Sequence, residues 1–299
     1  MKDLINIKGL KTEDILNLLD FADEIKKRQI RGEDYYKPLK DKTVITSFPP
    51  TSMRTRISFE VGIFQLGGNS INMPIDFEGK EPLEDKVGYL NCWIDYLVIR
   101  CKNQEIIEEI AKKGKFSVIN AMTNLSHPCE ILSDLQTIRE KRGNLQNLKF
   151  VFVGEGHNIC NTWFEAAAKL NLNLTQVCPK GYEINKELFD YARSKSKGDI
   201  YTTNNLQEGV KDADIILTDG WPVGEDNIEE FNKFLPYRLS LDKIKGGNRE
   251  CLINPCPPFT RGHEITDEII KSKHFIGYSC KENLLHMQKA IIASLYKIP

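Results

Sequence analysis

The chain has 299 residues, of which 41 are Lys or Arg and 42 are Asp or Glu, so its formal net charge is only -1. Such a balance gives no overall field for a polyanion and argues against nucleic acid or an acidic membrane as the main partner. A hydrophobic fraction of 40% and a charged fraction of 28% are typical of globular proteins, and the length predicts two domains.

The first half of the chain predicts helices and strands in alternation. After Thr12, the expected N-cap, apolar residues recur at helical spacing and predict an amphipathic helix. Further apolar runs predict strands at 43–48, 69–73, 96–99 and 117–121, with helices around 59–64 and 83–93 and from Pro128 to about Gly143. This alternation is typical of a parallel α/β sheet.

The second half repeats the pattern. A buried strand is predicted at 149–153, followed by a glycine turn and a helix at 162–170, further strands at 174–178, 214–218 and 251–254, and a last helix at 282–296. We therefore expect an α/β protein whose two domains are each a parallel sheet flanked by helices. The expected domains are 1–135, on which a C-terminal helix in 281–299 packs back, and 136–280.

The segment Ser52-Met53-Arg54-Thr55-Arg56 places two hydroxyls and two permanent cations at a predicted helix start. Free backbone N–H groups at such a start, together with guanidinium groups, bind phosphate. A capped helix with solvated arginines is the alternative interpretation.

Three other patterns limit the class of protein. The eight cysteines show no Cys-x-x-Cys pair or zinc spacing, which favours reduced thiols in the cytoplasm. No signal peptide is recognisable, and no apolar stretch approaches the roughly 18 residues that span a bilayer, so we expect no membrane association. The turn Gly154-Glu155-Gly156 lacks the third glycine of a dinucleotide site.

Several motifs resemble the aspartate/ornithine carbamoyltransferase family in order and spacing. They are the Ser52–Arg56 segment, Tyr96–Arg100, His127-Pro128-Cys129-Glu130, and Pro255-Cys256-Pro257-Pro258 followed by Arg261-Gly262. The segments 153–158, 218–221 and 282–286 look like the ornithine branch. The resemblance implies an active-site cleft between the domains, a homotrimer, no metal or organic cofactor, and carbamoyl transfer from carbamoyl phosphate to an amino acid, with ornithine giving citrulline in arginine metabolism.

The resemblance also implies roles for individual residues. Arg100 would bridge phosphate and carbonyl oxygens, and His127 would donate to the carbonyl oxygen. The bond before Pro258 would be cis. The full carbamoyl phosphate set is expected to be Ser52, Met53, Arg54, Thr55, Arg100, His127, Glu130 and Pro257.

On the acceptor side the resemblance implies three residues. Asn158 and Asp219 would hold the amino-acid end of the acceptor, and Cys256 would lie near the attacking amine. Arg100, His127 and Cys256 are thus the expected catalytic residues.

The chain departs from the ornithine enzymes at three single positions and in one three-residue segment. Met53 stands for threonine, Glu130 for glutamine, Pro222-Val223-Gly224 for Ser-Met-Gly, and Leu284 for arginine. These departures leave two alternatives open. One is a carbamoyltransferase for a different amine, such as a diamine or another diamino acid; the other is a catalytically silent relative that binds anions.

Overall fold

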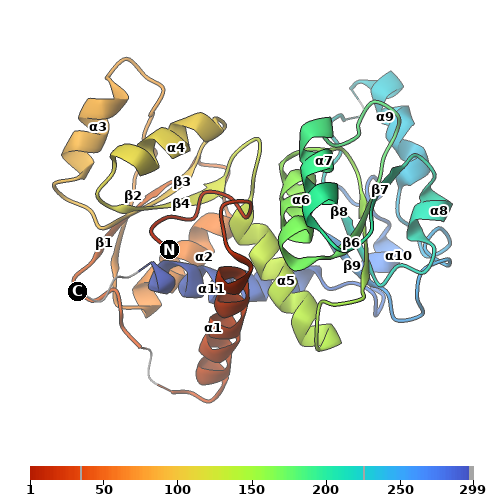
Figure 1. Ribbon diagram of the computed structural model, residues 1–299, viewed down its shortest axis with the longest axis horizontal. Helices are drawn as coiled ribbons and strands as arrows, with labels where there is room; N and C mark the ends of the chain where they lie inside the picture. The colour runs from red at the N-terminus through yellow and green to blue at the C-terminus, as the bar shows by residue number, and fades with distance from the viewer. Residues whose placement is uncertain (34–35, 225, 296–299) are drawn as a thin grey trace. The chain divides into compact units, whose positions relative to one another are not determined.

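The computed structural model describes residues 1–33, 36–224 and 226–295. The chain divides into two compact units (Figure 1). Unit 1 contains Met1–Lys141 and the described residues from Lys281 onward, and unit 2 contains Arg142–Cys280. Each unit has a parallel sheet flanked by helices, which confirms the predicted α/β class. Among the described helices, none is both long and apolar enough to cross a bilayer.

Unit 1 is built on a sheet with the strand order β2-β1-β3-β4, in which all neighbours are parallel. Its strands are β1 (Thr43–Ser47), β2 (Asn69–Asn72), β3 (Tyr96–Arg100) and β4 (Ser117–Met122). Buried Val and Ile side chains fill β3, as expected for a central strand that is covered on both faces.

Helices cover both faces of this sheet. Val87 and Ile107, from α3 and α4, are buried against Ile45, Leu97 and Val118 on one face, and α2, α5 and α11 lie on the other face (Figure 1). The helices are α1 (Thr12–Ile30), α2 (Arg54–Gln65), α3 (Leu83–Leu90), α4 (Gln104–Lys113), α5 (Pro128–Arg142) and α11 (Gly277–Ser294).

Unit 2 has a sheet with the order β7-β6-β5-β8-β9, again parallel throughout. The elements are β5 (Lys149–Val153), α6 (Asn158–Leu170), β6 (Asn173–Val177), α7 (Lys186–Lys195), β7 (Ile200–Thr203), α8 (Leu206–Val210), β8 (Ile215–Thr218), α9 (Ile228–Phe234), a 3-10 turn (Leu235–Tyr237), β9 (Leu252–Pro255) and α10 (Asp267–Ile270).

Alternate residues of β5 point to opposite faces of the sheet. Phe150 lies 5.6 Å, centroid to centroid, from Trp163 of α6. Val151 belongs to a buried cluster on the other face with Val210 of α8 and Ile269 of α10. Both faces of β5 are thus buried, which explains its continuous apolar sequence.

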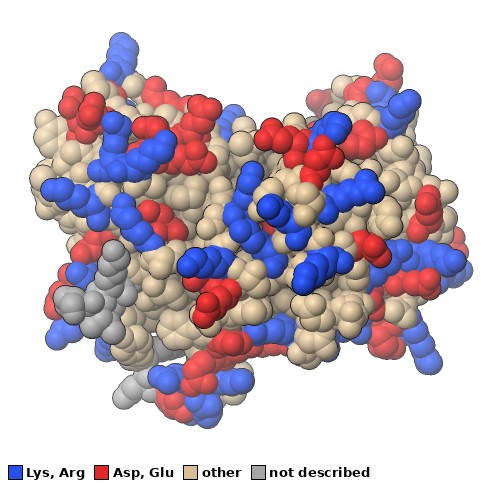
Figure 2. All heavy atoms as spheres, viewed as in Figure 1, with Lys and Arg blue, Asp and Glu red and all other residues tan. Residues whose placement is uncertain are grey.

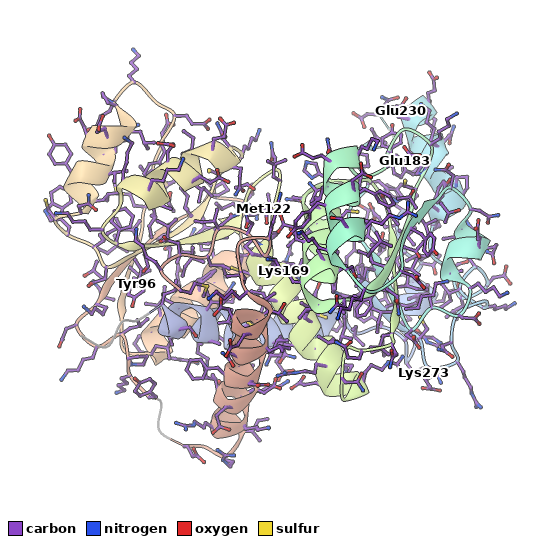
Figure 3. All side chains as sticks on the ribbon, in the orientation of Figure 1. Tyr96, Met122, Lys169, Glu183, Glu230 and Lys273 are labelled. Atoms are coloured by element: carbon purple, nitrogen blue, oxygen red, sulfur yellow. The ribbon has the colours of Figure 1, made fainter. Side chains whose placement is uncertain are left out.

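In both sheets the strand order reverses at one point. In unit 1 the chain goes from β1 outward to β2 and returns to β3 on the other side of β1. In unit 2 it goes from β5 outward through β6 and β7 and returns to β8 on the other side of β5. Open α/β sheets bind ligands beyond the carboxyl ends of the strands at such switch points. Figure 3 labels Tyr96 and Met122, which mark the beginning of β3 and the end of β4.

The predicted strands agree with the structure to within about two residues, but two helices begin earlier than predicted. α6 begins at Asn158 instead of 162, because polar residues of its first turns are buried and hide the apolar pattern. α11 begins at Gly277 instead of 282, and Tyr296, the predicted end, lies outside the described residues. The sequence did not predict α4, β7 or α7–α10, most of which are short elements.

Candidate active site

The first group of predicted site residues meets at the switch point of unit 1. Ser52 is buried in a turn beyond β1, where its backbone N–H donates to the carbonyl of Pro49 at 3.0 Å. Arg100 is the last residue of β3, and its Nη1 donates to Oγ of Ser52 at 3.4 Å. A hydroxyl from the turn beyond β1 and a guanidinium from the end of β3 therefore form a hydrogen bond.

The first turn of α2 is open toward anions. Arg54 begins the helix, no side chain caps it, and the described residues of its first turn include no acidic one. Anions are stabilised at such a start by free N–H groups and by the helix dipole. Arg56 is engaged elsewhere, since its Nε donates to Glu60 at 3.0 Å. The Met53 residue is 58% exposed, so it offers only its backbone to this turn.

His127 and Glu130 follow β4, the neighbour of β3, and both are buried. Pro128 begins α5, where its missing N–H and fixed φ suit a first helical position. Burial and the nearby Lys281 and Arg100 cations lower the pKa of His127 well below 6.5. A neutral imidazole has one N–H donor, which is what polarisation of a carbonyl oxygen needs.

Lys281 is a residue of this group that the sequence analysis missed. Its ammonium contacts Oε1 of Glu130, whose side chain is only 4% exposed. Oε2 of Glu130 lies 4.0 Å from Nε2 of His127. A lysine therefore pairs with the carboxylate that replaces the family's glutamine. The only feature of the sequence that could have indicated Lys281 is its position directly before Glu282-Asn283.

The residues predicted to bind the acceptor lie at the switch point of unit 2. Asn158, Asp219 and Cys256 follow β5, β8 and β9, which are neighbours in the sheet. The backbone N–H of Cys256 donates to the carbonyl of Thr218 at 2.7 Å, which ties the ends of β9 and β8 together. The bond between Pro257 and Pro258 is cis, as the resemblance predicted.

The glycine turn after β5 allows a close approach of two backbones. A Cβ on Gly156 would lie 2.4 Å from Cα of Ile184, so no larger residue fits without movement. Gly154 has a φ of +150°, a conformation that L side chains rarely adopt. The turn leads directly into Asn158, the first residue of α6.

Asp219 lies in an acidic environment. Burial, followed by the nearby Glu264 and Glu155 carboxylates, raises the pKa of Asp219 to about 7, although a hydrogen bond from the Gly220 backbone N–H opposes the rise. Glu264, which the sequence analysis did not single out, is buried and accepts from the backbone N–H of Trp221 at 2.7 Å. This environment suits a cationic ligand group.

Positive charge is local to unit 1's site and does not form a general field. Figure 2 shows Lys and Arg side chains interspersed with Asp and Glu over the face in view, as the net charge of -1 leads us to expect. The grouped Arg54, Arg100 and Lys281 are therefore a specific arrangement.

Family models match nearly the whole chain. The carbamoyl-P binding domain of aspartate/ornithine carbamoyltransferases matches residues 2–140, and the Asp/Orn binding domain matches residues 146–295. The chain belongs to the aspartate/ornithine carbamoyltransferase family. It is an enzyme of the carbamoyltransferase class.

Similar proteins come from several organisms. An ornithine carbamoyltransferase of Geobacter metallireducens is 39% identical over 92% of both chains. One from Methanosphaera stadtmanae is 35% identical over 99% of this carbamoyltransferase and 100% of its own length. The solved ornithine carbamoyltransferase of Pyrococcus furiosus is 31% identical and superposes with a TM-score of 0.94 over 98% of this chain and 96% of its own.

Proposed function

We propose that this carbamoyltransferase moves the carbamoyl group of carbamoyl phosphate to the side-chain amine of ornithine, giving citrulline and inorganic phosphate. The observation that carries the proposal is the meeting of Ser52, Arg100 and His127 beyond three adjacent strand ends, next to the first turn of α2. The hydroxyl and the guanidinium groups would hold the phosphate, and the imidazole would donate a hydrogen bond to the carbonyl oxygen.

The chemistry follows from these placements. The amine nitrogen attacks the carbamoyl carbon, and the carbonyl oxygen takes up negative charge in the tetrahedral state. His127, held neutral by its surroundings, donates an N–H to this oxygen, and Arg100 adds a cation. Donors that are already oriented toward a developing oxyanion contribute most of such a rate enhancement.

The reaction needs no separate protein base. A free alkylamine has a pKa near 10.4, so it must lose one proton before it attacks. As the tetrahedral state collapses, the carbon–oxygen bond to phosphate breaks and the phosphate leaves with the electron pair. The departing phosphate then accepts the second proton of the amine, while Arg54 stabilises its charge.

The acceptor would be oriented by the residues of unit 2. Asp219 pairs with the α-ammonium group of ornithine, and Asn158 offers its amide to the same end of the molecule. Cys256 lies near the attacking amine. The acidic surroundings of Asp219 support this assignment, because they favour a cation over a neutral ligand.

A direct assay tests this function. The purified protein is incubated with carbamoyl phosphate and ornithine, and citrulline and phosphate are measured together. Equal amounts of both products are expected. Phosphate without citrulline would mean hydrolysis, and binding of carbamoyl phosphate with no product from any amine would identify a silent anion-binding relative.

Another amine acceptor is a second candidate, and the segment after Asp219 favours it. Pro222-Val223-Gly224 replaces the family's Ser-Met-Gly, and the adjoining Trp221 stacks on His263 with ring centroids 6.0 Å apart and planes at 12°. An aromatic cluster of this kind packs against apolar chain better than against a carboxylate. A panel of diamines and diamino acids in the same assay separates the two acceptors.

We further propose a homotrimer in the cytoplasm. Ile57, Val61 and Phe64 form an exposed apolar stripe along α2, and Ile71 and Met73 are exposed on and just beyond the neighbouring strand β2. Contiguous exposed apolar residues mark association surfaces. All eight cysteines lie in the described part of the chain and are free thiols, which is the usual state in a reducing compartment.

A further inference from the structure

A buried ion pair joins α11 to α5 beside the proposed phosphate residues. Lys281 Nζ contacts Oε1 of Glu130, and the other carboxylate oxygen lies 4.0 Å from His127 Nε2. The side chains of Lys281 and Glu130 are 18% and 4% exposed. Removing a buried charge from its partner is costly, so these two groups depend on each other.

The packing of α11 gives the Lys281 ammonium a defined place. Asn283 donates to Oγ1 of Thr137 on α5 at 2.9 Å. Further along, Gln288 donates to the backbone carbonyl of Thr55 at 3.4 Å. α11 is thus anchored to both helices whose first turns carry the proposed ligands of carbamoyl phosphate.

Lys281 also belongs to a group of cations that repel one another. Burial and the Arg54 guanidinium lower the pKa of Lys281 to about 7, while the contact with Glu130 favours its charged form. Lys281 and Arg100 both lower the pKa of His127. A bound dianion would relieve the repulsion among these cations.

Two of the chain's departures from its family lie in α5 and α11, the helices that the Lys281–Glu130 pair joins. The resemblance places a glutamine at Glu130 and an arginine at Leu284, and Lys281 precedes Leu284 by three residues, which puts the two positions on one face of α11. We propose that Lys281 is a ligand for the phosphate of carbamoyl phosphate, which replaces the cation absent at Leu284 and holds Glu130 toward the carbamoyl NH2. The identity of this anion rests on the proposed function.

Three variants test the role of Lys281. Lys281→Met removes the charge and keeps the length of the side chain. Glu130→Gln with Lys281→Met removes the whole pair and restores the family's glutamine. Lys289→Met is the matched control, because Lys289 is a fully buried lysine on the same helix whose Nζ donates instead to Gln29 at 3.0 Å and Gln65 at 2.9 Å.

Calorimetric binding of carbamoyl phosphate and of inorganic phosphate, without amine, is the measurement, and Tm is recorded for each variant. We expect Lys281→Met to lower the affinity for both anions by about tenfold or more, which is the effect of losing one charge-assisted contact. The double variant should recover its Tm and still bind both anions several-fold more weakly than the wild type. The control should bind them as the wild type does, whatever its Tm.

A merely structural pair predicts a different result. The double variant would then recover wild-type affinity for both anions together with its Tm, and this outcome would overturn the proposal. Adding Leu284→Arg to the double variant provides rescue, since a cation returned to the same helix face should restore phosphate affinity. Failure of that rescue, with the variant folded, would also count against a shared site.

The outcome for Lys281 is separable from the outcome for the reaction. If the wild type binds carbamoyl phosphate but carbamoylates no amine, the transfer function fails while the affinities still decide the role of Lys281. If the wild type binds neither anion, the assignment of Lys281 is wrong.

Discussion

Arg100 donates from Nη1 to Oγ of Ser52 at 3.4 Å, although 48 positions separate the two residues in the sequence. The contact exists because β1 and β3 are neighbours and Ser47 is in register with Ile99. Parallel pairing carries both chain segments out of the sheet at the same edge. The strand order therefore assembles the proposed phosphate site.

The phosphate and acceptor groups should contribute unequally to the rate. Arg54→Ala removes a cation from the leaving group, so kcat/KM should fall about 100-fold or more. Cys256→Ala removes one weak thiol contact and should cost less than about tenfold. Steady-state kinetics with both substrates measures the two effects, and similar losses for the two variants would contradict the assigned roles.

His127 should act as a neutral donor. Because the pKa of His127 is held well below 6.5, its ring NMR signals should not titrate between pH 6.5 and 8. His127→Gln should lower kcat about 100-fold, with carbamoyl phosphate affinity nearly unchanged. A titration midpoint near 6.5 would show that the buried environment described for the imidazole is incorrect.

The same histidine should make the protein sensitive to acid. Its unfolded form binds a proton near pH 6.5, while its folded form resists protonation. The contribution of His127 to the unfolding free energy should therefore fall as the pH drops below about 6.5. Denaturant unfolding measures this contribution. When the pH falls from 7 to 5, His127→Gln should lose less unfolding free energy than the wild type loses.

Asp219 should link acceptor binding to pH. With the pKa of Asp219 raised to about 7, the folded carboxyl binds its proton more tightly than the unfolded one, so its contribution to stability is lost as the pH rises from about 4 through 7. A cationic acceptor favours the carboxylate, so ornithine affinity should rise between pH 6 and 8. Asp219→Asn should bind ornithine weakly with no such rise; an unchanged pH profile in this variant would assign the titration to another group.

The turn before α6 should not tolerate a side chain. Gly156→Ala places a Cβ 2.4 Å from Cα of Ile184, and relief of this overlap should cost about 1–3 kcal/mol of unfolding free energy. Gly88→Ala is the control, since its Cβ meets nothing within 4 Å inside α3 and should be neutral or slightly stabilising. Equal stabilities of the two variants would refute the close approach.

The apolar stripe on α2 should mediate assembly. Phe64 is 79% exposed, and Phe64→Glu should shift the protein from trimer to smaller species. Ile30→Glu at the end of α1 changes a residue of similar exposure, 75%, outside the stripe and should leave the assembly intact. Analytical ultracentrifugation distinguishes the species, and a monomeric wild type would contradict the proposed assembly.

Sequence patterns predicted every strand of the two sheets except β7, and they named most of the residues of the proposed site. Strand Lys149–Val153 has a continuous apolar run after its lysine, and strand Thr43–Ser47 is buried from Val44 onward. The segments that follow both strands carry distinctive polar motifs. α11 was placed too late because Gly277, a weak helix former, begins it.

Lys281 could not be predicted from local pattern. Its role depends on Glu130, which lies on another helix far away in the sequence, and a lysine before an acidic residue usually points to solvent. The pairing arises from tertiary packing of α11 on α5, which no local sequence pattern specifies. The same holds for Glu264, whose partner Trp221 follows a different strand.

The most direct test of the central claim follows the carbamoyl carbon itself. The enzyme is mixed with carbamoyl phosphate labelled with ¹³C at the carbonyl and with ornithine, and the label is followed by NMR. The account predicts that the label appears in the ureido carbon of citrulline, with one phosphate released for each citrulline formed. Label that remains in carbamoyl phosphate or in its hydrolysis products, for ornithine and for every other amine offered, would contradict it.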